Sequence, residues 1–158
     1  MSSRVIPTID SEHAARCELA RRPPASPRVL VVDDDADLRA LIALSLEHEG
    51  CRVTEATSAS EAIDRARAAL RGVPGAGIDV MITDVRMPGI DGMSLVKLLR
   101  DADFSIPIII LSGLADPLLR EEAAAYGARV MDKPVGLRDL REAVALALAR
   151  PSSAGSTC

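Results

Sequence analysis

Apolar runs of strand length alternate with amphipathic stretches of helix length over most of the chain. The first predicted helix covers residues 36–49 and the fifth covers residues 137–149. The three helices between them are predicted to begin near residues 58, 92 and 117. The predicted strands cover residues 28–32, 51–55, 78–83, 106–111 and 130–132. Such alternation is typical of a parallel sheet with helices on both faces, so we expect an α/β fold with five strands and five helices.

Capping residues mark where the predicted helices begin. Asp35 can cap the first helix, Ser58 and Glu61 form a capping-box pattern before the second, and Asp116 precedes a proline at the start of the fourth. Apolar spacing then predicts which residues face the sheet. For the first two helices these are Leu38, Leu41, Ile42, Ser45, Ala62, Ile63, Ala66 and Leu70.

Both ends of the chain lack this alternation. Residues 1–27 are polar and close in a proline-rich stretch, and a short helix within them would be marginal in isolation. Residues 151–158 are rich in Ser, Gly and Thr. We therefore expect a disordered N-terminal leader over 1–27, one folded domain over 28–150, and a disordered tail over 151–158.

Composition narrows the possible functions. Hydrophobic residues make up 48% of the chain and aromatic residues 1%, so the core must consist of Ala, Val, Leu and Ile. A net charge of −4 argues against nucleic acid as a partner, since binding by bulk electrostatics needs a basic face. No apolar run reaches the roughly 20 residues of a membrane span, and the first residues do not resemble a signal peptide. We expect a cytoplasmic protein with no membrane partner, whose Cys17, Cys51 and Cys158 are reduced thiols.

Polar and charged residues that could take part in chemistry stand where the predicted strands end. Asp33 and Asp34 follow the first strand, Asp84 the third, Ser112 the fourth and Lys133 the fifth. Ligands of open parallel sheets bind outside the carboxyl ends of the strands, so these groups can converge on one pocket. Taken singly, each also has a structural interpretation as a helix cap, a turn residue or a solvated loop residue. Their joint occurrence in this order favours a shared site.

Three carboxylates in one pocket would repel one another unless cations compensate them. Lys133 and a bound Mg²⁺ (or Mn²⁺) supply that compensation, and Mg²⁺ prefers carboxylate, water and phosphate oxygens. Such a site suits a phosphoryl group. Asp84 would be the nucleophile that forms an acyl phosphate, while Lys133 and Ser112 stabilise the phosphoryl oxygens.

Four motifs resemble the receiver domain of two-component response regulators. The resemblance covers Arg28 to Arg150. The motifs are Val31–Asp35 (VVDDD), Thr83–Gly92 (TDVRMPGIDG), Ile109–Gly113 (IILSG) and Asp132–Pro134 (DKP).

The resemblance implies a flavodoxin-like doubly wound sheet with strand order 2-1-3-4-5. It implies Asp84 as the phosphoacceptor, Asp34 as a direct Mg²⁺ ligand, Asp33 as a ligand through water and the backbone carbonyl of Arg86 as a further ligand. It gives Ser112 and Lys133 the switch-hydroxyl and phosphate-binding roles. A sensor histidine kinase or a phosphotransfer protein would donate the phosphoryl group. The chain would then be a phosphoacceptor signalling domain rather than an enzyme, and would act through contact with a downstream protein.

The chain departs from the family pattern near its fifth strand. Val130 stands where the family usually carries an aromatic switch residue, the segment from Gly127 to Lys133 is one residue shorter than usual, and Val135 replaces a common Phe. Tyr126 at the end of the fourth helix is interpreted as a packing residue. These changes affect the expected coupling to output rather than the phosphorylation chemistry.

Two other functions remain open. A phosphorylation-independent adaptor, or pseudo-receiver, would retain the acidic pocket as a relic, which the intact set of site residues argues against. A Mg²⁺-dependent phosphohydrolase would use a nucleophile on the first strand and a proton donor two residues later, a spacing that Asp33 and Asp35 satisfy. That alternative leaves Asp84 without a role, so we expect a stand-alone receiver.

Overall fold

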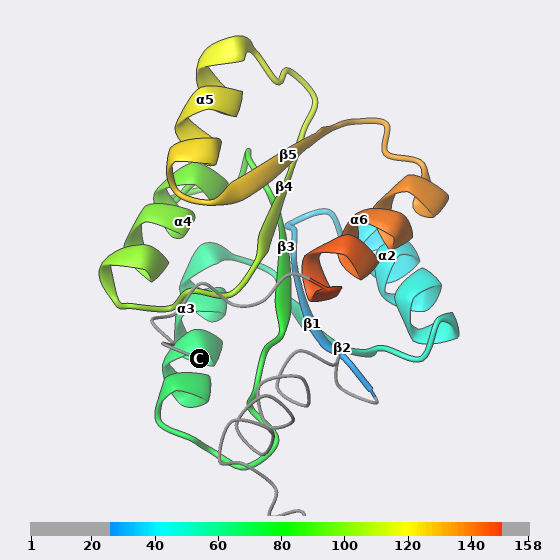
Figure 1. Cartoon of the computed structure of the whole chain (residues 1–158), viewed down its shortest axis with the longest axis vertical. Coiled ribbons are helices and arrows are strands. Elements are labelled where there is room, and N and C mark those ends of the chain that lie inside the picture. Colours follow the sequence, from blue (N-terminus) through cyan, green and yellow to red (C-terminus); the bar gives the residue numbers. More distant parts are fainter. Residues whose placement is uncertain (1–25, 150–158) are drawn as a thin grey trace, which may run out of the picture.

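Five parallel strands form one sheet in the order β2-β1-β3-β4-β5 (Figure 1). The structure is a computed structural model that describes residues 26–149, so most of the predicted leader and all of the predicted tail lie outside the described residues. The strand order agrees with the flavodoxin-like order predicted from the sequence. The strands are β1 (Arg28–Val32), β2 (Arg52–Ala56), β3 (Val80–Asp84), β4 (Ile108–Ser112) and β5 (Ala128–Asp132).

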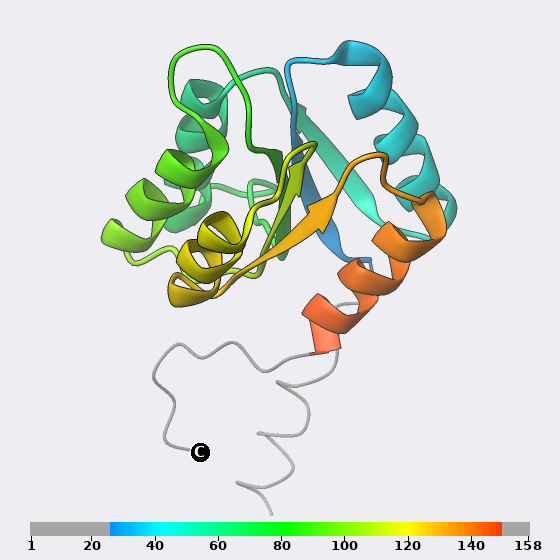
Figure 2. The ribbon, with the colours of Figure 1, turned by 90° about the horizontal axis from the view of Figure 1, so that it is seen from above.

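Helices cover both faces of the sheet. One face carries three of them and the other carries two, an arrangement that can be followed in Figure 2. The three are α3 (Ala59–Leu70), α4 (Gly92–Asp101) and α5 (Pro117–Ala125), and the two are α2 (Ala36–His48) and α6 (Leu137–Ala149). The predicted alternation of five strands and five helices is confirmed.

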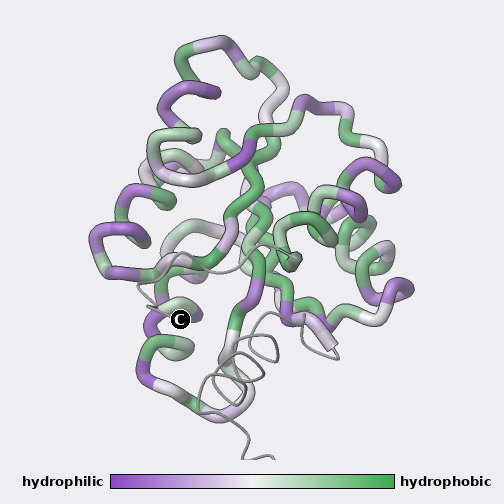
Figure 3. The backbone as a smooth tube through the Cα atoms, viewed as in Figure 1, coloured by the Kyte–Doolittle hydropathy of each residue, from purple (hydrophilic) through white to green (hydrophobic). Residues whose placement is uncertain are grey.

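A separate apolar core lies on each side of the sheet. Leu30, Met81 and Ile110 face α3, α4 and α5, whereas Val31 and Ile82 face α2 and α6. All residues of β3 and β4 are buried, as expected for central strands covered on both faces. In Figure 3 the tube along the middle strands is mostly green, the colour of hydrophobic residues. Strands β3 and β4, which end in Asp84 and Ser112, are thus packed on both faces.

The buried stripe of α2 differs from the predicted one. Ile42, Ala43 and Leu46 are buried, whereas Leu41 is 50% exposed and Ser45 is only partly buried. The helix carries apolar residues on more than one face, so spacing alone allowed two orientations. Packing against the sheet selects the stripe that contains Leu46.

Other expectations need smaller corrections. Leu70, predicted to face the sheet, is 50% exposed because α3 ends there and the sheet lies beneath its earlier turns. Strand β5 begins at Ala128, two positions before the predicted start, because pairing with β4 extends over the Ala128–Asp132 segment. The predicted strand at 51–55 is shifted by one residue, to Arg52–Ala56.

The predicted caps at Asp35, Ser58 and Asp116 are present. Ser58 Oγ accepts a hydrogen bond from the Glu61 amide at 3.2 Å. Asp116 Oδ1 accepts one from the Leu119 amide at 2.7 Å, with Pro117 in the first turn as predicted. These bonds fix the loops that lead into α3 and α5.

Within residues 26–149, none of the helices has the length and apolar character that crossing a membrane requires. Cys51 is a free thiol, and burial raises its pKa. Cys17 and Cys158 lie outside the described residues.

Candidate functional site

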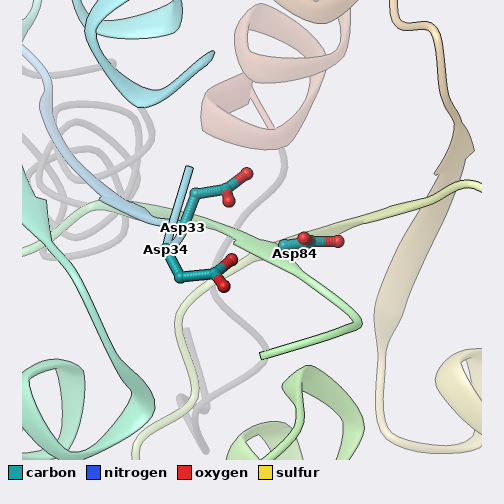
Figure 4. Close-up of side chains that lie close together, drawn as sticks. All are labelled: Asp33, Asp34 and Asp84. Carbon is teal, nitrogen blue, oxygen red and sulfur yellow. The ribbon is translucent and has the colours of Figure 1, made fainter. Parts of the chain in front are cut away.

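The three carboxylates predicted to share a site do lie together. Asp33 and Asp34 follow β1, and Asp84 is the last residue of β3. Because β1 and β3 are paired neighbours, their carboxyl ends meet at one edge of the sheet. One carboxylate oxygen from each of the three residues lies within 4.8 Å of the others (Figure 4). This arrangement offers a cluster of oxygen ligands of the kind that divalent cations prefer.

Lys133 reaches this cluster from the loop after β5. Its Nζ atom lies 3.2 Å from Asp84 Oδ2 and 3.7 Å from Asp33 Oδ2. The Lys133 amide also donates to the Ser112 carbonyl at 2.8 Å, which ties the loop to the end of β4. The ammonium therefore bridges two carboxylates that would otherwise repel each other.

Asp33 is the most constrained of the three acids. Its side chain is buried, and Oδ1 accepts a hydrogen bond from the Asp35 amide at 2.9 Å. Burial raises the pKa of Asp33, while the Asp35 amide and Lys133 act in the opposite direction. Among the described residues, no hydrogen bond satisfies Asp33 Oδ2. An unsatisfied buried carboxylate oxygen beside two further carboxylates fits a metal ion or its bound water.

Asp84 is held by residues close to it in the sequence and by the start of α4. Its side chain is almost fully buried, and Oδ1 faces the Arg86 amide at 3.4 Å. Thr83 Oγ1 donates to the Asp84 carbonyl at 3.1 Å. On the other side of that carbonyl lies Gly92, where a Cβ atom would stand 2.2 Å from the Asp84 oxygen. The start of α4 thus packs directly against the Asp84 peptide.

Ser112 and Arg86 lie next to Asp84, one at the end of the neighbouring strand β4 and the other two residues along the chain. Ser112 follows Leu111, the register partner of Asp84, and its buried Oγ accepts a hydrogen bond from the Leu114 amide at 3.2 Å. That bond leaves the hydroxyl proton available to another acceptor. Arg86 lies in the loop between β3 and α4, and its side chain is exposed.

Around Val130, which stands where the family usually carries an aromatic switch residue, an arginine links α5 to β5. Val130 is partly buried against the core beneath α5. Arg120 donates to the Val130 carbonyl at 3.3 Å and to both oxygens of Asp132 at 2.6 and 2.7 Å. Tyr126 lies before the start of β5, at the opposite end from Lys133, with Lys97 5.8 Å above its ring. This location separates Tyr126 from the acidic cluster, but its side chain is 36% exposed and belongs to neither apolar core, so the predicted packing role is not supported.

Asp35 is engaged in a way that disfavours the phosphohydrolase alternative. Its Oδ1 accepts hydrogen bonds from the Asp37 and Leu38 amides at 3.1 and 3.2 Å, so it caps α2. A proton donor would have to be directed toward a group bound at Asp33. The structure instead uses this carboxylate to begin the helix.

Sequence reasoning missed Arg39, which lies in α2 and bonds to the backbone of Asp33. An arginine near the start of an amphipathic helix reads as an ordinary exposed residue, so the sequence carried no signal for this contact. A cavity of about 640 Å³ lies between the loop after β3 and α5, with Met87, Met93 and Leu119 in its wall.

Comparison with known proteins places these features in a family. The model of the response regulator receiver domain matches residues 29–145. The transcriptional regulatory protein FixJ of Azorhizobium caulinodans is 35% identical over 133 residues, which cover 84% of this chain and 60% of that protein. The chain thus spans under two thirds of this curated relative.

Solved receiver structures have the same fold. A response regulator receiver protein from Pseudomonas putida is 34% identical, with a TM-score of 0.67 over 77% of this chain and 98% of that one. The receiver domain of a Francisella response regulator is 31% identical, with a TM-score of 0.68 over 78% of this chain and 97% of that one.

Proposed function

Because the chain belongs to the response regulator receiver domain family, we propose that it is a phosphoacceptor in a two-component pathway and that Asp84 carries the phosphoryl group. The donor would be a phosphohistidine on a sensor histidine kinase or a phosphotransfer protein. The phosphorylated domain would then act through contact with a downstream protein. The observation that carries the proposal is the Lys133 ammonium 3.2 Å from Asp84 Oδ2, inside a cluster of acids.

In this reaction an Asp84 carboxylate oxygen attacks phosphorus as the phosphorus–nitrogen bond of the donor breaks. The imidazole leaves with the electron pair of that bond, takes up a proton, and an acyl phosphate remains on Asp84. Lys133 already contacts the Asp84 carboxylate, and its ammonium can stabilise the negative charge on the phosphoryl oxygens during transfer. Ser112 can donate its hydroxyl proton to one of those oxygens, because its Oγ only accepts in the bond from Leu114.

The acidic cluster would hold Mg²⁺ (or Mn²⁺) through Asp33, Asp34, Asp84 and the backbone carbonyl of Arg86. The buried Oδ2 of Asp33 supports this assignment, since among the described residues it receives no hydrogen bond and the Lys133 ammonium stays 3.7 Å away. When bound, the cation would neutralise negative charge on the transferring phosphoryl group. The chain's own contribution is to hold its carboxylates close together despite their repulsion.

A labelling experiment tests the proposal. The full chain is incubated with a small phosphodonor such as acetyl phosphate, with Mg²⁺ or with EDTA, and the intact mass is measured. We expect one base-labile phosphoryl group on the parent, none on Asp84→Asn and none in EDTA. Asp79→Asn is the matched control, because Asp79 pairs with Arg28 at the far end of β1. Labelling of Asp84→Asn at the parental level, or labelling that persists in EDTA, would refute the assignment.

A further inference from the structure

Arg39 makes two short hydrogen bonds next to the acidic cluster. Its Nη1 donates to the Asp33 carbonyl at 2.7 Å, and its Nε donates to Glu55 Oε2 at 2.7 Å. Arg39 comes from α2, and Glu55 lies near the end of β2. Only 13% of the Arg39 side chain is exposed, compared with 42% for Glu55. The guanidinium thus lies against the loop that carries Asp33 and Asp34.

The carbonyl that Arg39 binds belongs to the peptide unit joining Asp33 to Asp34. On the other side of the same residue, the Asp33 amide donates to the Ala56 carbonyl at 3.1 Å. The backbone is therefore fixed on both sides of Asp33. Asp34 is exposed, so this peptide largely determines where its carboxylate points.

We propose that Arg39 is a positioning residue for the metal site, which orients the Asp33–Asp34 peptide so that both carboxylates can bind one divalent cation. This inference rests on the proposed function. Arg39 acts through the backbone and does not touch the cation or the phosphoryl group. Because Glu55 compensates the charge of Arg39, the pair contributes geometry rather than net charge at the site.

An arginine suits this role better than a lysine. The planar guanidinium offers donors in a fixed fork, so one side chain can hold a carbonyl and a carboxylate in a set relation. A lysine ammonium at this position keeps the charge but lacks that fixed geometry. Groups that orient metal ligands typically contribute about 10–100-fold to metal affinity, which sets the expected size of the effect.

The test separates Mg²⁺ affinity from fold stability. The Mg²⁺ dissociation constant of the full chain is measured by calorimetry, and stability in EDTA is measured by urea unfolding. We expect Arg39→Ala to weaken Mg²⁺ binding by about tenfold or more, and Arg39→Lys to weaken it less. Glu55→Gln should weaken Mg²⁺ binding less than Arg39→Ala, because the amide oxygen can still accept from Arg39, although the charge of Arg39 is then no longer compensated.

Arg100→Ala is the matched control. Arg100 also donates to backbone carbonyls, those of Phe104 at 2.6 Å and Tyr126 at 2.9 Å, but at the end of α4 away from the acids. Its loss should lower stability and leave the Mg²⁺ dissociation constant unchanged. In EDTA, hydrogen exchange of the Asp34 and Asp35 amides should quicken in Arg39→Ala and not in Arg100→Ala.

A double variant adds a further check. In an Asp34→Asn background, Arg39→Ala should weaken Mg²⁺ binding by a smaller factor than in the parent, because the carboxylate that it positions is gone.

Arg39→Ala with parental Mg²⁺ affinity would overturn the inference while leaving the proposed function intact. If Arg39→Ala does not fold, Arg39→Lys replaces it, and parental affinity in that variant has the same meaning. A parent chain that neither binds Mg²⁺ nor accepts a phosphoryl group would instead refute the proposed function.

Discussion

Replacing Asp33 by Asn should stabilise the metal-free protein, although Asp33 is buried within the fold. The carboxylates of Asp34 and Asp84 offer oxygens within 4.8 Å of one on Asp33, and each such pair repels by about 0.9 kcal/mol in water-like surroundings or about 3.5 kcal/mol at an effective dielectric constant near 20. The attraction between Asp33 and the Lys133 ammonium, 3.7 Å away, is about 1.1 kcal/mol in water-like surroundings or about 4.5 kcal/mol at the higher estimate. The repulsion exceeds the attraction in both limits.

We expect Asp33→Asn to raise the free energy of unfolding by about 1 kcal/mol, nearer the lower limit because Asp34 is exposed and solvent screens it. The hydrogen bond from the Asp35 amide survives, since Asn keeps an oxygen at the Oδ1 position. Urea unfolding in EDTA at neutral pH should show a midpoint about 0.5 M higher, for a typical slope of 1–3 kcal/mol per M.

The pH dependence of this gain has a definite sign. Burial raises the pKa of Asp33, so the folded state binds the proton more tightly than the unfolded state. Stability from this group is present below its ordinary pKa of 3.8 and is lost as the pH rises through the folded value. The gain from Asp33→Asn should therefore be largest at neutral pH and should fade toward pH 3.8.

The same substitution elsewhere supplies the control. Asp79 accepts hydrogen bonds from the Arg28 amide at 2.8 Å and from its guanidinium at 3.1 and 3.2 Å, so Asp79→Asn should lower the unfolding midpoint. Saturating Mg²⁺ should stabilise the parent more than Asp33→Asn. A lower midpoint for Asp33→Asn in EDTA would contradict the reasoning, because it would mean that attraction to Lys133 outweighs repulsion among the acids.

Two further predictions concern the phosphorylated state. The acyl phosphate should decay over minutes or longer in Mg²⁺ buffer, because Arg86 and the 72% exposed Leu114 are bulky and cannot accept a proton from an attacking water. Decay within seconds in the absence of a phosphatase would contradict this prediction. Beryllofluoride with Mg²⁺, a mimic of the phosphoryl group, should shift amide signals around Ser112–Leu119 strongly and those around Val130 only modestly, since no aromatic ring rotates at Val130. Equal or larger changes centred on Val130 and α6 would refute that route.

Strand periodicity was sufficient to predict where the acids meet. In a parallel sheet the carboxyl ends of all strands lie at one edge, so apolar runs that end in Asp33, Asp84 and Lys133 predict proximity without any knowledge of side-chain contacts. The capping prediction at Asp35 succeeded for a similar reason, because a cap depends on residues within one turn of the helix.

Features that depend on packing between distant segments were not predictable in this way. The exposure of Leu41 follows from how α2 lies on the sheet, and its own sequence offers apolar residues on more than one face. The bond from Arg39 to the Asp33 carbonyl depends on a rotamer that Glu55, from another strand, helps to hold. The spacing of residues within one helix carries no information about the exposure of Leu41 or about the bond from Arg39.

Gly92 has a consequence for how tolerance to mutation should be interpreted in this domain. A side chain at that position would need the space occupied by the Asp84 carbonyl, and backbone cannot yield as the end of a flexible side chain can. In a comprehensive substitution library, position 92 would then reject replacements about as strictly as position 84, although glycine performs no chemistry. Intolerance at the two positions has different origins, steric at one and chemical at the other. A map of mutation-sensitive positions, taken alone, would therefore assign Gly92 to the reactive centre, although its role is only to leave space for the Asp84 carbonyl.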